Sequence, residues 1–138
     1  MEKIRATEFF APDISADTAA FWEGCKEHKL VLQKCKKCGK LRWPAAYLCP
    51  NCLSDETELC ELSGEGVIYS YAIYHKPFHP SVADKVPYVV AEVDLKEGAR
   101  LVSNIVDCEL SELKCGLPVE VRFIDGEGYA RPVFVLKK

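Results

Sequence analysis

The chain has 138 residues, of which 49% are hydrophobic and 28% charged, and its formal net charge is −3 at pH 7. This balance argues against a protein that binds nucleic acid through overall positive charge. No apolar run approaches the ~18 residues of a membrane span, and the segment after Met1 lacks a charged-then-apolar leader, so we expect a cytoplasmic protein with no membrane partner.

Residues 1–29 are predicted to form a helical arm. Asp13 and Ser15 are candidate N-caps, and the segment SADTAAFWEGCKEHK carries an apolar stripe at helical spacing. Phe21 and Trp22 make this stripe broad. The arm has no hydrophobic complement of its own. The aromatic pair is therefore expected either to pack on the rest of the chain or to dock on a partner protein.

Residues 30–59 are predicted to form a metal-binding module. Two CxxC pairs, ten residues apart, place four sulfurs where they can converge: Cys35, Cys38, Cys49 and Cys52. This spacing is typical of a closed tetrahedral zinc site. Iron is the alternative metal, because four thiolates also hold iron. A closed site leaves no coordination position for a substrate, so we expect the metal to be structural.

The other cysteines follow no metal-ligand pattern, and we expect them to be buried small hydrophobic residues: Cys25, Cys60, Cys108 and Cys115. The charge around the module is uneven, because residues 26–42 contain seven Lys or Arg and one acid. Two interpretations stay open. The run either is the solvated surface of a metal knuckle or binds the phosphates of a ligand or an acidic partner.

From about residue 60 the apolar pattern alternates with a period of two. The segments GVIYSYAIYH, YVVAEVDL, ARLVSNIV, PVEVRFID and PVFVLKK are predicted to be strands, separated by glycine- and proline-containing turns. Five strands in about eighty residues predict a small closed barrel of the OB type, with an SH3-like barrel as the alternative. A short helix expected at residues 109–116 favours the OB fold. The irregular segment 75–87 is a long loop of the kind that often carries function.

The order of arm, ribbon and barrel resembles one family closely. The segments FWEGCKEHKLVLQKCKKCGKLRWPAAYLCPNC, SGEGVIYSYAI and PYVVAEVDLKEGARLVSNIV are similar to the zinc-ribbon/OB-fold proteins of acyl-CoA metabolism, known as domain of unknown function 35. The resemblance covers nearly the whole chain. It implies a mainly β chain with an N-terminal helical arm (1–29), a rubredoxin-like zinc ribbon (30–59) and a five-stranded OB-fold barrel (60–138).

The resemblance also implies a function. Members look like non-catalytic accessory subunits that bind CoA or acyl-CoA and hold a thiolase-type enzyme. Some are thought to bridge an acetoacetyl-CoA thiolase and a hydroxymethylglutaryl-CoA synthase. From residue chemistry we predict that the CoA moiety contacts Lys36, Lys37, Lys40, Arg42, Phe78 and Arg100, with Arg131 as a further candidate. Phe21 and Trp22 are the predicted docking residues for the partner.

No catalytic motif accompanies these features. The sequence has no GxSxG, HExxH or glycine-rich phosphate loop, so we expect an accessory protein rather than an enzyme. The main alternative is a single-stranded nucleic-acid-binding protein, because OB barrels bind oligonucleotides on their second and third strands. Here residues 60–138 hold nine bases and twelve acids, which disfavours that function. Electron transfer is a third possibility and would need iron.

Overall fold

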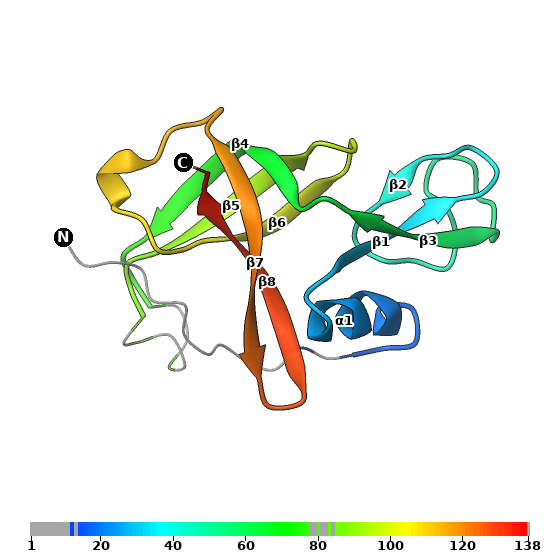
Figure 1. Cartoon of the computed structure of the whole chain (residues 1–138), viewed down its shortest axis with the longest axis horizontal. Helices are drawn as coiled ribbons and strands as arrows, with labels where there is room; N and C mark the ends of the chain where they lie inside the picture. Colours follow the sequence, from blue (N-terminus) through cyan, green and yellow to red (C-terminus); the bar gives the residue numbers. More distant parts are fainter. Residues whose placement is uncertain (1–11, 13, 78–79, 81–82, 84, 138) are drawn as a thin grey trace.

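The computed structural model describes residue 12, residues 14–77, residues 80 and 83, and residues 85–137. A small three-stranded sheet lies at one end of the molecule and a closed β-barrel at the other, with a helix beside the connection between them (Figure 1). The predicted fold class, mainly β with an N-terminal helix, a ribbon and a five-stranded OB barrel, is confirmed. No helix in the described ranges is long and apolar enough to cross a membrane.

Helix α1 (Ala19–Lys26) is shorter than the sequence predicted. A turn in which the Thr18 N–H donates to the Ser15 carbonyl precedes it, and Thr18, not the predicted Ser15, is the N-cap residue. The other predicted cap, Asp13, lies outside the described residues. At the far end, His28 adopts a positive φ of 59°, and its ring stacks on Phe123 with centroids 5.3 Å apart. The helix is thereby connected to the barrel.

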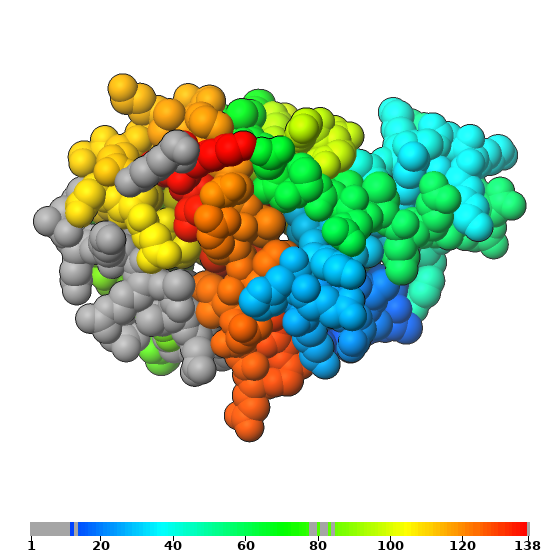
Figure 2. All heavy atoms as spheres, viewed as in Figure 1, coloured from blue at the N-terminus to red at the C-terminus, as the bar shows by residue number. Residues whose placement is uncertain are grey.

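The helix lies directly against the ribbon sheet. Gly24 is buried, and a Cβ added there would come within 2.8 Å of the Val31 side chain. A glycine at this position lets the helix approach the first strand, at a modest cost in helix propensity. On the face shown in Figure 2, atoms of the helix and of the strand after it (blue) fill the space between the C-terminal hairpin (orange) and the ribbon (cyan and green).

Three antiparallel strands form the ribbon sheet, in the order β2-β1-β3. The central strand β1 (Leu30–Cys35) pairs with β2 (Leu41–Arg42) through Gln33 opposite Arg42. Its other edge pairs with β3 (Thr57–Leu62), from Leu30 opposite Leu62 to Cys35 opposite Thr57. The ribbon sheet therefore continues as far as Leu62, and the barrel follows after a short turn.

The barrel closes in the order β4-β5-β6-β8-β7. Its pairings are antiparallel except between β6 and β8, which meet in parallel at Ile105 and Phe134. This mixed closure is the OB arrangement rather than the SH3-like one. The predicted short helix is present as the 3-10 turn η2 (Leu110–Glu112). The strands are β4 (Glu65–Tyr74), β5 (Tyr88–Leu95), β6 (Arg100–Ile105), β7 (Pro118–Gly126) and β8 (Tyr129–Leu136).

Alternation along the strands places the core inside the barrel. In β5 the inward side chains are Val89, Ala91, Val93 and Leu95, each at most 4% exposed, while the residues between them face outward. Burying a valine or leucine side chain of this kind stabilises the fold by ~1.5–3 kcal/mol. The same alternation leaves one outward face on β5 and β6, while the helix itself contacts the barrel mainly at β8.

Candidate metal centre and the neighbouring surfaces

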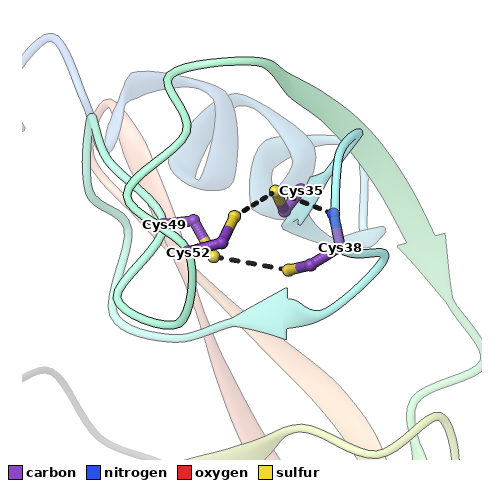
Figure 3. Close-up of side chains that lie close together, drawn as sticks. All are labelled: Cys35, Cys38, Cys49 and Cys52. Carbon is purple, nitrogen blue, oxygen red and sulfur yellow. Dashed lines mark hydrogen bonds between the residues drawn. The ribbon is translucent and has the colours of Figure 1, made fainter.

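The four predicted ligand sulfurs converge on one point between two turns (Figure 3). The Sγ atoms of Cys35 and Cys52 are 3.6 Å apart, as are those of Cys38 and Cys49, and all four lie within 4.8 Å of one another. A tetrahedron of Zn–S bonds of about 2.3 Å separates its sulfurs by about 3.8 Å. The donor set and its spacing therefore fit a single tetrahedral metal ion held by four thiolates.

The two CxxC turns have the same backbone geometry. In the first, the Gly39 N–H donates to the Cys35 carbonyl at 2.9 Å; in the second, the Leu53 N–H donates to the Cys49 carbonyl at 2.8 Å. The residue after each pair has a positive φ, 77° at Gly39 and 64° at Leu53. Gly39 adopts this conformation without a steric penalty because it has no Cβ. Leu53 was not predicted, because leucine rarely adopts this conformation.

Backbone donors prepare the sulfurs for a cation. Hydrogen bonds from backbone N–H groups, chiefly those of Cys38, Lys40 and Cys52, lower the pKa values of Cys35, Cys38 and Cys49 respectively. The Ser54 N–H also lowers the pKa of Cys52, but burial and the neighbouring thiols together raise it to about 11. The site thus favours thiolates at three sulfurs, and a bound cation would favour the fourth.

Arg42 is part of the ribbon's internal structure, and this corrects its prediction as a CoA contact. Only 5% of the residue is exposed. Its guanidinium donates to Gln33 Oε1 at 2.8 Å and to the Ala46 carbonyl at 2.9 Å, and it also bonds to Thr57. Arg42 therefore ties together two strands and the loop between the CxxC pairs, and its charge is not available to a phosphate.

Unlike the buried Arg42, the three lysines predicted to contact CoA lie on the surface. Lys36, Lys37 and Lys40 are exposed on the first turn, and none of them makes an ion pair within the described part of the chain. Lys40 also borders a cleft of about 520 Å³ between the ribbon and the β5–β6 turn, together with Lys34 and Glu97. These lysines remain candidates for an anionic ligand.

Two of the CoA contacts predicted on the barrel, Arg100 and Phe78, have different outcomes. Arg100 Nε lies 2.6 Å from Asp94 Oδ1, and its guanidinium stacks over Tyr69 at 3.6 Å. The hydrogen bond to Asp94 is the main cause that raises the pKa of Arg100. Its positive charge is thus already balanced by a carboxylate. Phe78 lies outside the described residues.

The aromatic pair of the arm is divided between the core and the surface. Phe21 is 5% exposed and its ring centroid is 4.5 Å from that of Trp43, so it packs within the chain and is not a docking residue. Trp22 meets Phe21 edge to face with centroids 5.0 Å apart and is only partly buried. The sequence left open whether this pair packs on the rest of the chain or docks on a partner protein, and Phe21 packs on the rest of the chain.

Trp22 lines an apolar groove that the sequence did not predict. The groove has a volume of about 250 Å³ and lies between the two tryptophans and the outward face of β5 and β6. We call it the aromatic groove, and its principal lining residues are Trp22, Trp43, Val90, Val102, Asn104 and Arg131. The alternating pattern of β5 and β6 places both valines on one face. The sequence contains no local pattern that places Trp22 and Trp43 opposite these two valines.

Polar groups occupy one wall of the aromatic groove. Arg131 Nη1 donates to Asn104 Oδ1 at 2.8 Å, and Asn104 Nδ2 donates to the Val89 carbonyl, also at 2.8 Å. The amide is thus held at both ends. Burial lowers the pKa of Arg131, although a guanidinium still remains charged at neutral pH. The groove therefore combines apolar walls with one fixed positive charge.

Comparison with known proteins identifies both halves of the structure. Residues 22–58 match the family model described as the ChsH2 rubredoxin-like zinc ribbon domain, and residues 60–123 match that of the ChsH2 C-terminal OB-fold domain. A solved structure described as the Ltp2-ChsH2(DUF35) aldolase is 38% identical, with a TM-score of 0.82, and the match covers 91% of this chain and 98% of that one.

Three curated relatives are similar across most of the chain. A DUF35 domain-containing scaffold protein of Methanocaldococcus jannaschii is 38% identical over 74% of this chain and 73% of that protein. A benzoylsuccinyl-CoA thiolase subunit of Thauera aromatica is 35% identical over 75% and 67% respectively. A probable enoyl-CoA hydratase alpha subunit of Thermomonospora curvata is 40% identical over 84% of this chain, but the match spans only 36% of that longer protein.

Proposed function

Since the chain belongs to the DUF35 family of zinc-ribbon and OB-fold proteins, we propose that it is a non-catalytic accessory subunit that binds an acyl-CoA and holds a thiolase-type enzyme. The observation that carries this proposal is the closed four-sulfur site in a chain whose relatives are named as subunits or scaffolds. Four thiolates leave no coordination position for a substrate, so the metal takes no part in bond-making, and the proposal assigns that chemistry to the partner.

We propose zinc as the resident metal. When bound, the ion cross-links the two CxxC turns and supplies folding free energy that this short segment cannot obtain from apolar burial. Cys35, Cys38, Cys49 and Cys52 would hold it, and the backbone N–H groups described above would stabilise their thiolates. A purified protein that is colourless with one zinc per chain supports this assignment, whereas visible absorption from bound iron contradicts it.

The exposed lysines of the first CxxC turn are proposed to bind the CoA phosphates. Lys36, Lys37 and Lys40 are solvent-accessible, and Lys40 borders the cleft of about 520 Å³. Replacing all three with alanine should weaken CoA binding by about threefold to about 150-fold, because each exposed ion pair contributes ~0.2–1 kcal/mol. Lys114→Ala, an exposed lysine elsewhere on the surface, is the matched control. Equal CoA affinity in the triple variant and the control would remove the lysines from the site.

The partner is proposed to be a thiolase-type enzyme, because two relatives are named as benzoylsuccinyl-CoA thiolase subunits. In a more specific form of this proposal, the chain also binds a hydroxymethylglutaryl-CoA synthase and bridges it to the thiolase. The nucleic-acid alternative has little support on the barrel, since Glu92 and Asp94 alternate outward along β5 on the face that OB proteins use for oligonucleotides.

The direct test is affinity purification of the tagged full chain from extracts of its own cells, with mass spectrometry of the proteins retained. A thiolase in stoichiometric amount, with or without a synthase, is the expected result. The tag alone serves as the control for non-specific capture. Retention of ribosomal or polymerase components, or of nucleic acid in a salt-sensitive manner, would reject the acyl-CoA assignment.

A further inference from the structure

The aromatic groove is a second ligand surface, separate from the lysines around the metal centre. It contains both tryptophans of the chain, Trp22 and Trp43. Val102, one of its lining residues in the middle of β6, is 54% exposed, so the groove presents apolar surface to solvent. An open apolar surface bordered by polar groups is typical of a binding site.

The size of the groove limits what it can hold. At about 250 Å³ it is slightly smaller than the pockets of about 300–1,000 Å³ that enclose drug-sized ligands. It therefore has room for a short chain or a single ring and not for an entire CoA molecule. The nucleotide end of a CoA ester is polyanionic, and the groove offers it only one positive charge.

The polar wall specifies the chemistry of the ligand's end. Arg131 is held by Asn104, which is itself fixed to the backbone of β5 through the Val89 carbonyl. A guanidinium fixed beside apolar walls favours an oxygen acceptor, and hydrogen bonds to a charged group are stronger than neutral ones. An apolar chain that ends in a carboxylate or thioester carbonyl matches this arrangement.

We propose that the aromatic groove binds the acyl group of an acyl thioester or of the corresponding free acid, with its carbonyl or carboxylate oxygen at Arg131. This inference rests on the proposed acyl-CoA function for its biological ligand, and it assigns the acyl end of that ligand to a different surface from the phosphate end. Trp22 and Val102 supply the apolar contacts, so the groove would select for acyl groups longer than acetyl.

The location of the tryptophans makes the groove directly observable. Because Trp22 and Trp43 are the only two in the chain, intrinsic tryptophan emission reports on this surface alone. The full, zinc-loaded chain is titrated with CoA, acetyl-CoA, octanoyl-CoA, octanoate and octan-1-ol, and emission is recorded alongside calorimetry. Octanoyl-CoA should bind about tenfold or more tightly than acetyl-CoA, since two buried methylenes suffice for that difference. Octanoate should change the emission saturably.

Two variants and one control test the assignment of residues. Val102→Glu places a carboxylate on the groove floor and should abolish the preference for octanoyl-CoA. Val67→Glu, at an outward valine of β4 that is 41% exposed and outside the groove, should leave it intact. Arg131→Met should weaken octanoate while octan-1-ol, which has no charge, binds as before. Equal sensitivity to Val102→Glu and Val67→Glu would contradict the inference.

The probes also separate this inference from the function on which it rests. Equal affinities for CoA, acetyl-CoA and octanoyl-CoA with unchanged tryptophan emission would overturn the groove assignment and leave CoA binding in place. Emission changes with octanoate that Val102→Glu removes, without binding of any CoA compound, would support the groove and reject the CoA proposal. No response to any probe would reject both. An emission shift that grows with protein concentration alone would show that a second copy covers the groove, and would overturn the inference.

Discussion

The ribbon and the barrel obtain their stability by different means. Between residues 36 and 59 the only buried residues are Arg42 and Cys49, whereas the barrel buries a continuous apolar cluster that includes Val89, Leu101 and Phe134. Leu30, Leu32 and Leu62 of the ribbon sheet belong to the same cluster, but the segment after Cys35 has four converging thiols in place of an apolar core. A metal centre can hold a short segment whose apolar burial would be insufficient.

The difference also determines what each region can present to a partner. Because its fold depends on sulfur ligation, the ribbon can leave large apolar side chains in solvent, and Tyr47, Leu48 and Leu53 are each more than half exposed. In the barrel, β5 alternates strictly between buried and more exposed residues, and the cluster inside the barrel takes most of the large apolar side chains. Predictions that separate metal content from barrel stability therefore test the comparison directly.

The largest effect is expected from removing a metal ligand. Cys49→Ser should abolish stoichiometric zinc binding and unfold the ribbon, because structural zinc contributes ~10–16 kcal/mol in isolated zinc-finger peptides. Metal analysis and limited proteolysis across residues 36–56 measure the two consequences. Cys115, which the sequence predicted to be buried, is exposed and lies outside the cluster, so Cys115→Ser should keep its zinc. Full metal content in Cys49→Ser would show that the ligand assignment is wrong.

A cavity in the barrel core should lower the stability of the fold without removing the metal, which is the reverse of the effect of replacing a ligand. Phe134 is fully buried and lies opposite Val121 and Ile105, so Phe134→Ala should cost ~3–5 kcal/mol in the free energy of unfolding. Zinc content per folded chain should not change. Denaturant unfolding followed by metal analysis provides the measurement, with Val102→Ala as an exposed control expected to cost less than ~1 kcal/mol. Simultaneous loss of zinc would indicate that the two regions fold as one unit.

A smaller effect distinguishes a structural arginine from a ligand-binding one. Arg42→Met removes the hydrogen bonds to Gln33 and Ala46 and should destabilise the chain by ~1–3 kcal/mol. CoA affinity, measured by calorimetry on the folded protein, should stay the same. If this variant melts like the unmodified protein but binds CoA more weakly, Arg42 contacts the ligand after all.

The smallest effect concerns the two left-handed positions after the CxxC pairs. Gly39→Ala should lose ~1–2 kcal/mol, since a Cβ meets no neighbour there and the cost is backbone strain alone. Leu53→Gly removes equivalent backbone strain and should therefore stabilise the turn. Part of this gain is offset by the greater conformational freedom of glycine in the unfolded chain. Competition with a zinc chelator compares the two variants. Weaker zinc retention in Leu53→Gly than in Gly39→Ala would contradict this account.

Features that depend on local spacing could be predicted from the sequence. The ligand set followed from two CxxC pairs, and the barrel strands followed from alternation, as in the inward Val89, Ala91 and Val93. The start of the helix was misplaced because a turn between Ser15 and Thr18 competes with helix at that point. Several polar residues near a helix start compete as caps, and only the structure selects one.

Features that depend on tertiary contacts were missed. Arg42 lies in a run of bases that looks solvated, and its burial follows from the order of the strands, which brings Gln33 of β1 and Thr57 of β3 within hydrogen-bonding reach of its guanidinium. The aromatic groove joins Trp22, Trp43 and Val102, which are separated by up to eighty residues. No local pattern records that the helix and the ribbon meet the outward face of β6.

Hydrogen exchange with and without a zinc chelator tests the central comparison most directly. On removal of the metal, backbone amides of residues 36–56 should lose protection, while those of β5, β6 and β8 should keep it. That result would show a metal-held ribbon attached to a barrel that is stable through its own core. Unchanged protection in the ribbon, or equal loss in ribbon and barrel, would contradict the account.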